Sequence, residues 1–416
     1  MNDIICAVST PPGMGAIAVI RLSGEGSIAV TDTLFVSPSG KKLAGTKANT
    51  VLFGQIVFNN EVTDEVLVTV FRAPHSFTGE ESVEISCHGS VYIQQKIVEA
   101  LIARGVRLAQ PGEFTRRAFG NGKFDLSQAE AVADLIASAS QASHRVAMNQ
   151  MRGGFAGKLA ELRDKLLQFV SLVELELDFP EEDVEFANRQ KLYELTEEIE
   201  REIDKLARSF QLGNAIKNGI PVAIIGETNA GKSTLLNLLL NEEKAIVSDI
   251  HGTTRDVIED TVNISGVSFR FIDTAGIRHT TDTIETMGIE RTFQKIGQAS
   301  IVLWMIDLTT PVEKIESLAE SIVPKLADKH VLLLFNKADL LPDAERVEKE
   351  HILPELKAER LFISAKKQQN TDVLQQLLLK AAAIPQIGEH DVIVTNLRHY
   401  EALVKALEAV RRVKEG

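Results

Sequence analysis

One short stretch restricts the possible folds of this chain more than any other. The apolar run PVAIIG at 221–226 leads directly into GETNAGKS at 226–233, which fits the pattern GxxxxGK[ST]. In such a loop, backbone N–H groups form a nest for phosphate oxygens, and the start of the next helix adds its positive end. Lys232 would reach the β- and γ-phosphates, and Ser233 would ligate Mg²⁺. The alternative is an ordinary glycine-rich turn. The predicted strand before the loop and helix after it favour the phosphate loop, because a plain turn requires neither.

Three further motifs follow in the order that a guanine-nucleotide site requires. DTAG at 273–276 would bring a carboxylate near Mg²⁺ and a glycine near the γ-phosphate. NKAD at 336–339 ends with Asp339, which would accept both N–H donors on the guanine edge, and adenine cannot supply these. SAK at 364–366 offers a backbone N–H to the guanine oxygen. These stretches look like the G motifs of Ras-like GTPases and predict GTP rather than ATP.

The group that activates the attacking water is less clear from the residues alone. The residue after the DTAG glycine is Ile277, an apolar side chain, where Ras has a water-orienting glutamine. Arg278, His279, Asp282 and Glu285 are all nearby candidates. Between the loop and DTAG, Thr254 would close over Mg²⁺, with an ordinary polar loop as the alternative. Many GTPases speed hydrolysis with the positive charge of an arginine side chain, the arginine finger. A monovalent cation could supply that charge instead, and Asn229 offers a neutral oxygen suited to K⁺.

The full set of predicted GTP-binding residues comprises the phosphate loop, the segment after it and the three later motifs. It consists of Asn229, Ala230, Gly231, Lys232, Ser233, Thr234, Ser248, Asp249, Ile250, His251, Gly252, Thr253, Thr254, Asp273, Thr274, Ala275, Gly276, Asn336, Lys337, Ala338, Asp339, Ser364, Ala365 and Lys366.

The rest of the chain predicts an α/β and α multidomain protein. The first part is mixed α/β, with β-rich runs at 16–22, 51–58, 65–72 and 82–89 and a helix over 91–105. A helical period then starts at Leu126, breaks at Pro180 and resumes. Alternating apolar runs and helices around the phosphate loop predict a parallel sheet covered on both faces. The last amphipathic helix would pack on the earlier helices, so the G domain is inserted in a helical domain. The predicted boundaries are 1–119, 120–212, 213–384 and 385–416.

Charge and cysteine content restrict the classes of function. The formal net charge of −13 argues against broad nonspecific nucleic-acid binding, although a local site stays possible. Arg104, Arg107, Arg116, Arg117 and Lys123 could form a patch that binds a nucleic-acid backbone, or they could be scattered surface charges. Only two cysteines occur, in no CxxC pair, which fits reduced thiols in a cytoplasmic protein. No apolar run reaches the roughly 18 residues that cross a bilayer.

With these motifs in hand, nearly the whole chain is similar to the MnmE (TrmE) family of tRNA-modification GTPases. The resemblance rests on stretches at 11–24, 75–90, 111–136, 178–186, 226–233, 249–256 and 273–278. The resemblance implies that this protein acts together with an FAD-dependent partner, MnmG, and that the two form a heterotetramer. The product would be a carboxymethylaminomethyl or aminomethyl group at C5 of the tRNA wobble uridine. The one-carbon unit would come from a tetrahydrofolate bound by the N-terminal domain, which would also form the homodimer.

The resemblance also implies roles for individual residues. Folate contacts fall on Arg21, Glu84 and Lys123, which by themselves could be a strand-end arginine, a cross-strand ion pair and a helix-cap lysine. Catalysis falls on Glu285. The metal assignments are Ser233 and Thr254 for Mg²⁺, and Asn229, Ser248, Ile250 and Thr253 for K⁺.

Two departures and two alternatives accompany this interpretation. Ser248 stands where the family leads us to expect threonine. Family members end in a Cys-containing tail that this sequence lacks, and Cys6 and Cys87 should not inherit its role.

The alternative functions are a GTP-regulated RNA-binding or ribosome-assembly factor of the Era or Der type, and a dimer scaffold with a vestigial G domain. The intact lysine and guanine motifs speak against the scaffold.

Overall fold

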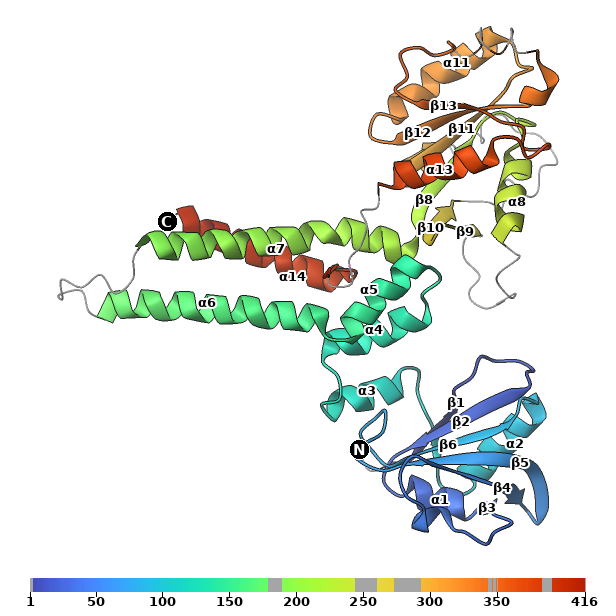
Figure 1. Ribbon diagram of the computed structural model, residues 1–416, viewed down its shortest axis with the longest axis vertical. Coiled ribbons are helices and arrows are strands. Elements are labelled where there is room, and N and C mark those ends of the chain that lie inside the picture. Colours follow the sequence, from blue (N-terminus) through green and yellow to red (C-terminus); the bar gives the residue numbers. More distant parts are fainter. Residues whose placement is uncertain are drawn as a thin grey trace. The chain divides into compact units, whose positions relative to one another are not determined.

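A computed structural model describes residues 3–178, 189–243, 260–272, 293–342, 346, 349, 351–383 and 391–415. The chain divides into two compact units (Figure 1). The first comprises Met1–Ala133 with Met151–Ala156, and the second comprises Asp134–Gln150 with Gly157–Gly416. No helix among the described residues is both long and apolar enough to cross a membrane.

The first unit is built on a seven-stranded sheet with the order β3-β4-β5-β6-β2-β1-β7. Only β1 and β7 pair in parallel, and every other pair is antiparallel. The four predicted strands and the helix are confirmed, while three short strands escaped prediction because they carry little periodicity. The strands are β1 (Ile5–Val8), β2 (Ile17–Ser23), β3 (Phe35–Val36), β4 (Thr50–Phe58), β5 (Glu61–Phe71), β6 (Ser82–His88) and β7 (Arg107–Leu108).

Helices cover one face of this sheet, whereas parts of the other face are exposed. Helices α1 (Ser27–Asp32) and α2 (Val91–Ile102) bury the inward side chains in an apolar core. A short 3-10 turn, η1 (Leu43–Gly45), also contributes to this core through Leu43. Because side chains alternate along a strand, the residues between the core positions point to the opposite face. There Ile17, Phe53 and Leu67 are 67%, 51% and 48% exposed.

The strand register defines two rows across this exposed face. In the first row Phe53 pairs with Leu67, Leu67 with Ser86, and Ser86 with Val19. In the neighbouring row, two residues along the strands, Val51 pairs with Thr69, Thr69 with Glu84, and Glu84 with Arg21. The predicted folate residues Arg21 and Glu84 are therefore direct cross-strand neighbours on the face turned away from α1 and α2.

The second unit contains long helices that pack by apolar and ionic contacts. Helix α14 (Leu397–Glu415) lies along α7 (Arg189–Asn218), where the rings of Phe210 and Tyr400 stack at 4.6 Å (Figure 1). Arg411 donates to Glu200 at 3.0 Å in the same contact. The predicted packing of the last helix on the earlier ones is thus confirmed. Helices α5 (Gln141–Met151) and α6 (Gly154–Asp178) lie mostly in this unit, whereas α3 (Glu113–Gly120) and most of α4 (Leu126–Ile136) belong to the first unit.

A six-stranded sheet forms the rest of the second unit, with the order β13-β12-β11-β8-β10-β9. Helices α8 (Lys232–Glu243) and α13 (Thr371–Ala382) cover one face and α11 (Val312–Ile322) the other, as predicted. The 3-10 turns are η2 (Val323–Lys325) and η3 (Ala338–Leu340). The strands are β8 (Ile220–Ile225), β9 (Asp260–Ile264), β10 (Val267–Phe271), β11 (Ile301–Asp307), β12 (His330–Asn336) and β13 (Glu359–Phe362).

One strand of this sheet was not predicted. β9 runs antiparallel to β10 at the edge of an otherwise parallel sheet. Its sequence DTVNI buries only Val262 and Ile264, so it lacks the continuous apolar run of the strands buried on both faces.

Candidate functional site

The phosphate loop has the conformation that its sequence requires. It joins β8 to α8 and contains three residues with positive φ, namely Gly226 (141°), Asn229 (63°) and Gly231 (99°). A Cβ at Gly226 would lie 2.2 Å from the carbonyl oxygen of Met305, and one at Gly231 would lie 2.2 Å from Nδ2 of Asn336. Both glycines are therefore needed for backbone conformation and for close packing.

Lys232 lies inside this loop rather than in open solvent. Its Nζ donates hydrogen bonds to the carbonyl oxygens of Gly226 at 2.8 Å and Glu227 at 2.5 Å. Burial, together with the charge of Lys295, lowers the pKa of the Lys232 ammonium to about 8. The ammonium group therefore lies beside the nest with little access to water. A phosphate bound there would offset the cost of this lost hydration by pairing with the charge.

Asn336 links three motifs that are far apart in the sequence. Its buried side chain donates from Nδ2 to the carbonyl oxygen of Ala230 at 2.7 Å, and its Oδ1 accepts from the N–H of Ala365 at 3.0 Å. The next residue, Lys337, adopts a left-handed conformation and reaches Asp307 at 2.5 Å. The phosphate loop and the two predicted base-recognition segments are thus joined through one amide side chain.

Asp339 is exposed in η3, three residues after this asparagine. A hydrogen bond from Ser364 lowers the pKa of the Asp339 carboxyl, and the nearby Lys366 and Lys367 contribute in the same direction. An ionised carboxylate is a pure acceptor, as pairing with two base N–H groups requires. The loop, the NKAD motif and the SAK motif all follow the carboxyl ends of parallel strands, where ligands bind in sheets of this kind.

Part of the predicted site lies outside the described residues. This holds for the catalytic candidate Glu285, and it holds for Thr254 and for the three K⁺ candidates other than Asn229. The described residues contain no group of three or more His, Cys, Asp or Glu side chains that could hold a metal. The predicted residues outside the described ranges are Ser248, Asp249, Ile250, His251, Gly252, Thr253, Thr254, Asp273, Thr274, Ala275, Gly276 and Glu285.

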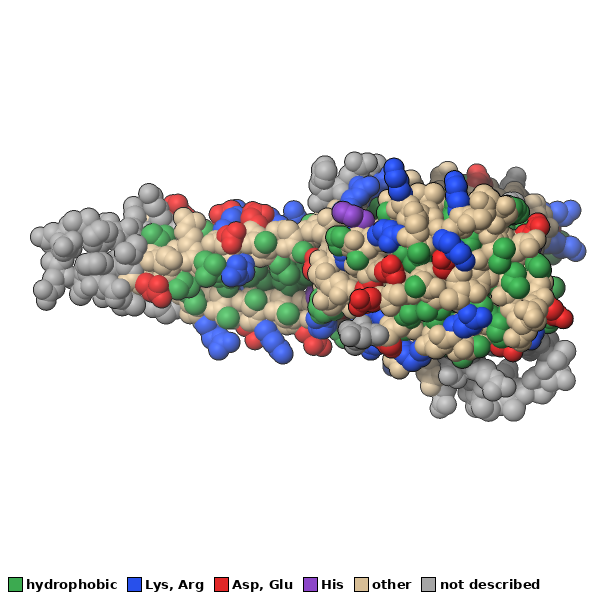
Figure 2. Space-filling view, turned by 90° about the horizontal axis from the view of Figure 1, so that it is seen from below, with side chains coloured by type: hydrophobic (Ala, Val, Ile, Leu, Met, Phe, Trp, Pro, Cys, Tyr) green, Lys and Arg blue, Asp and Glu red, His purple; other side chains and the backbone are tan. Residues whose placement is uncertain are grey.

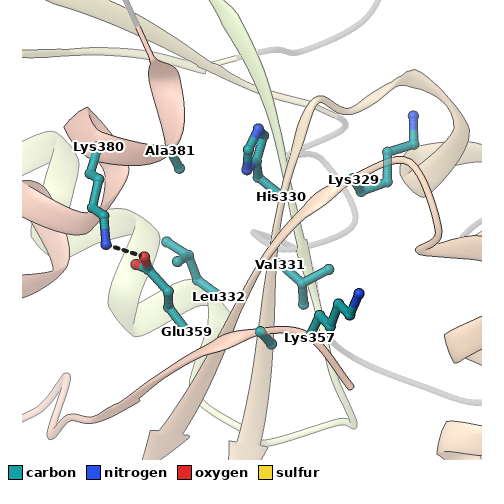
Figure 3. A pocket seen from close by; sticks show the side chains of 9 residues that line it. Lys329, His330, Val331, Leu332, Lys357, Glu359, Lys380 and Ala381 are labelled. Atoms are coloured by element: carbon teal, nitrogen blue, oxygen red, sulfur yellow. Dashed lines mark hydrogen bonds and ion pairs between the residues drawn. The ribbon is translucent and has the colours of Figure 1, made fainter. Parts of the chain in front are cut away.

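A hollow of about 390 Å³ lies at the opposite edge of the same sheet (Figure 3). It is lined at the amino ends of β12 and β13 by residues that include Lys329, His330 and Lys357. Lys380 pairs with Glu359 across it at 2.6 Å. Because ligands of parallel sheets bind at the carboxyl ends of the strands, this hollow is not the nucleotide site.

The first unit brings together two of the three predicted folate residues. Arg21 donates from Nε at 2.9 Å and from Nη2 at 2.7 Å, and both bonds end on Oε1 of Glu84. The two side chains are 27% and 26% exposed. This is the cross-strand ion pair that the residues alone suggested, and Glu84 Oε2 stays available for a further donor.

Aromatic rings surround this ion pair. The guanidinium of Arg21 lies 5.2 Å from the ring centroid of Phe77 and 5.8 Å from that of Phe114. Phe77 also meets Phe124 edge to face at 5.6 Å. Next to Phe124, Lys123 donates to the carbonyl oxygen of Pro74 at 3.2 Å. Sequence reasoning missed these rings, although they lie within the stretches that carry the family resemblance.

The suggestion of a basic patch is wrong for Arg117, whose side chain is only 2% exposed. Arg107 is 45% exposed, and it is paired with both Asp3 and Glu113. Figure 2 shows Lys and Arg side chains interspersed with acidic ones over the face that it draws. The i, i+4 spacing of Glu113 and Arg117 on one helix was the available signal for an internal ion pair.

Two protein-family models match the chain. The model described as the N-terminus of the GTP-binding protein TrmE matches residues 4–123. The model described as the MnmE helical domain matches residues 126–416.

Curated relatives match along the full length. A protein of Bacteroides thetaiotaomicron described as tRNA modification GTPase MnmE is 60% identical, over 100% of this chain and 90% of that protein. Proteins with the same description from Flavobacterium johnsoniae and Porphyromonas gingivalis are 52% and 51% identical, over 90% and 89% of their lengths. Among solved structures, Aquifex aeolicus Era bound to GDP and aluminium fluoride is 30% identical over 45% of this chain and 65% of that chain, with a TM-score of 0.30.

Proposed function

Because this chain belongs to the MnmE family of tRNA modification GTPases, we propose that it hydrolyses GTP in the course of modifying the wobble uridine of tRNA. The observation that carries the nucleotide part is the Asn336 link, which ties the phosphate loop to the base-recognition motifs. The modification would be a carboxymethylaminomethyl or aminomethyl group at C5, made with an FAD-dependent partner of the MnmG type. The chain would act as four segments, 1–119, 120–212, 213–384 and 385–416.

At the nucleotide, each residue has a distinct task. Lys232 neutralises the β- and γ-phosphates, and Asp339 selects guanine. Ser233 and Thr254 would hold Mg²⁺, whose charge offsets that of the phosphates, and the Ser233 hydroxyl suits it because Mg²⁺ takes hard oxygen ligands. Ser233 lies in the first turn of α8, next to the phosphate nest.

We expect Glu285→Ala to keep GTP affinity but to lose at least about a hundredfold in turnover, because Ile277 cannot orient the attacking water. In the proposal Glu285 acts through a bridging water. Single-turnover GTP hydrolysis and nucleotide titration of the same preparation separate the two effects. Asp282→Ala is the matched control, since it removes a neighbouring carboxylate. Normal turnover in Glu285→Ala would show that the assignment is wrong.

GTP turnover should be at least about tenfold faster in KCl than in NaCl at equal ionic strength, since a bound K⁺ would supply positive charge as an arginine finger does. The proposed ligands are Asn229, Ser248, Ile250 and Thr253. Support comes from Asn229, which lies exposed in the left-handed turn of the loop. Asn229→Ala should remove the difference between the two salts. Equal rates in the two salts for the unmodified protein would refute the K⁺ site.

The proposed folate site consists of Arg21, Glu84 and Lys123. The residues fit such a ligand in three ways. The free Oε2 of Glu84 can accept from a pterin ring, the two cations can pair with glutamate carboxylates, and Phe77 offers an aromatic face. Support for the first of these is that both Arg21 bonds end on the other oxygen of Glu84.

Calorimetric titration with formyl-tetrahydrofolate should give saturable binding that Arg21→Ala weakens at least tenfold, because a charge-assisted hydrogen bond is lost. Arg104→Ala is the control, since its exposed guanidinium contacts only Thr33 among the described residues. Absence of binding to the folded, unmodified protein would favour the alternative of an Era- or Der-type RNA-binding factor, which has no use for a folate pocket.

The exposed sheet face supports the proposed homodimer. Phe53 and Leu67 are exposed cross-strand neighbours there, Ile17 is exposed on the same face, and exposed apolar side chains of this kind mark interaction surfaces. A second copy of the same face would cover these side chains in an isologous contact. Because Arg21 and Glu84 lie in the neighbouring row, the dimer contact and the folate site would share one face of the sheet.

A further inference from the structure

Arg117 is the most deeply buried cation in the described part of the first unit. It projects from α3 with its side chain 2% exposed. Nη1 donates to the carbonyl oxygen of Asp3 at 2.9 Å and to Oε2 of Glu80 at 3.2 Å. Nη2 donates to Oδ1 of Asp3 at 2.7 Å and to Oε1 of Glu113 at 3.3 Å. With a longer bond from Nη1 to Oε1 of Glu80 at 3.5 Å, five bonds to three residues fix the plane of the guanidinium.

Glu80 connects this cluster to the loop 73–81. Its carboxylate also accepts from the hydroxyl of Ser23 on β2 at 2.8 Å. The same hydroxyl lies 2.6 Å from Oγ1 of Thr78, and both side chains are buried. From the end of α3, Asn121 donates to the carbonyl oxygen of Thr78 at 2.8 Å. The second half of the loop is therefore held by α3 on one side and by β2 on the other.

Phe77 precedes the first of these anchored residues. Its ring lies over the Arg21 guanidinium at 5.2 Å and meets Phe124 edge to face. The second ring near Arg21 is that of Phe114, which is itself part of α3. Any shift of the loop against α3 would separate the two rings that frame Arg21.

We propose that Arg117 and Glu80 form a buried ionic clamp that sets the loop 73–81 against α3 and so positions Phe77 over Arg21. Arg117 is then a positioning residue, which acts on the ligand site through Glu80 and Phe77 without touching the ligand. The inference deepens the proposed folate function and rests on it.

The energetics favour a geometric role over a purely stabilising one. Burying charges costs desolvation energy that offsets most of the Coulomb attraction, so apolar residues of similar size often stabilise a core as well or better. This cluster also leaves Nε of Arg117 buried without a hydrogen-bond partner. What the guanidinium supplies, and an apolar side chain would not, is a planar set of directed bonds that fixes one loop position.

Two variants of the full-length protein test the clamp. Glu80→Gln keeps the shape and an acceptor for Ser23 but removes the charge that faces Arg117. Arg117→Lys keeps the charge but loses the planar, multiple bonding. Arg107→Ala is the matched control, because Arg107 pairs with Asp3 and Glu113 in the same cluster but has no bond to the loop. Readouts are amide hydrogen exchange of residues 75–80 and calorimetric affinity for formyl-tetrahydrofolate.

We expect Glu80→Gln to speed exchange in residues 75–80 and to weaken formyl-tetrahydrofolate binding, each about tenfold, because a charge-assisted hydrogen bond is lost. Arg117→Lys should show intermediate losses, and Arg107→Ala should change both readouts less than twofold. Unchanged exchange and affinity in Glu80→Gln would overturn the clamp, as would equal losses in Arg107→Ala. If Arg117→Lys does not fold, Glu80→Gln decides alone.

The two readouts separate this inference from the proposed function. Faster loop exchange in Glu80→Gln, together with no folate binding by the unmodified protein, would refute the folate function and also the positioning role. Folate binding that is strong and equal in the unmodified protein and in Glu80→Gln would refute the clamp alone.

Discussion

Replacing Asp339 by asparagine should weaken GTP binding by a factor of about 10⁴ while creating affinity for xanthosine triphosphate. A site built to pair with N–H groups rejects a mismatched base by factors of this size, because buried polar groups are left unpaired. The carboxylate would accept from both guanine N–H groups, whereas an amide would place a donor opposite one of them. Xanthine carries an oxygen at that position and can accept from the amide.

The measurement is nucleotide titration with GTP and xanthosine triphosphate on both proteins. Asp328→Asn is the matched control, because it makes the same exchange at an exposed aspartate that lies outside the base-recognition segments. The Ser364 hydrogen bond keeps the pKa of the Asp339 carboxyl low, so the preference for guanine should hold throughout the neutral range. A variant that still prefers GTP would show that another group reads the base.

The sequence predicted the conformation of the phosphate loop because its signals are local. A phosphate loop needs glycine at positions of positive φ and close packing, so Gly226 and Gly231 identify the conformation directly. The link that Asn336 makes to the phosphate loop could not be predicted in the same way. Its bond to Ala230 joins residues 106 positions apart, and no spacing rule reports such a contact.

The N-terminal unit shows where sequence reasoning fails. Arg117 was grouped with surface cations because its neighbours in the sequence are basic, yet its partners Asp3 and Glu80 are distant in the sequence. The aromatic frame of Arg21 escaped notice for the same reason, since Phe77 and Phe114 come from a loop and a helix on different segments. Residues that are given a role by tertiary neighbours need the fold before that role is visible.

Replacing Lys232 by alanine should weaken GTP binding by a factor of about 10³ at pH 7.5, because removing one partner of a buried, hydrogen-bonded charge pair costs about 2–5 kcal/mol. Lys314→Ala is the matched control. This variant removes an ammonium group that lies 3.1 Å from Oε1 of Glu227, a residue of the phosphate loop. The Lys314 side chain is 65% exposed, so it is not held inside the loop as Lys232 is. Titration with a non-hydrolysable GTP analogue measures affinity without turnover. Affinity within threefold of the unmodified protein would show that the loop binds phosphate through its backbone alone.

The same lysine predicts how binding depends on pH. Its pKa of about 8 in the free protein should rise when phosphates bind, so its contribution is complete below pH 8 and is lost as the pH rises above that value. Affinity should then fall by up to about tenfold per pH unit, since only the protonated form pairs with phosphate. Lys232→Ala should lack this component, and comparing the two proteins from pH 7 to 9 removes any contribution from ionisation of the base. Parallel pH profiles would mean that Lys232 is not the group that binds phosphate as a cation.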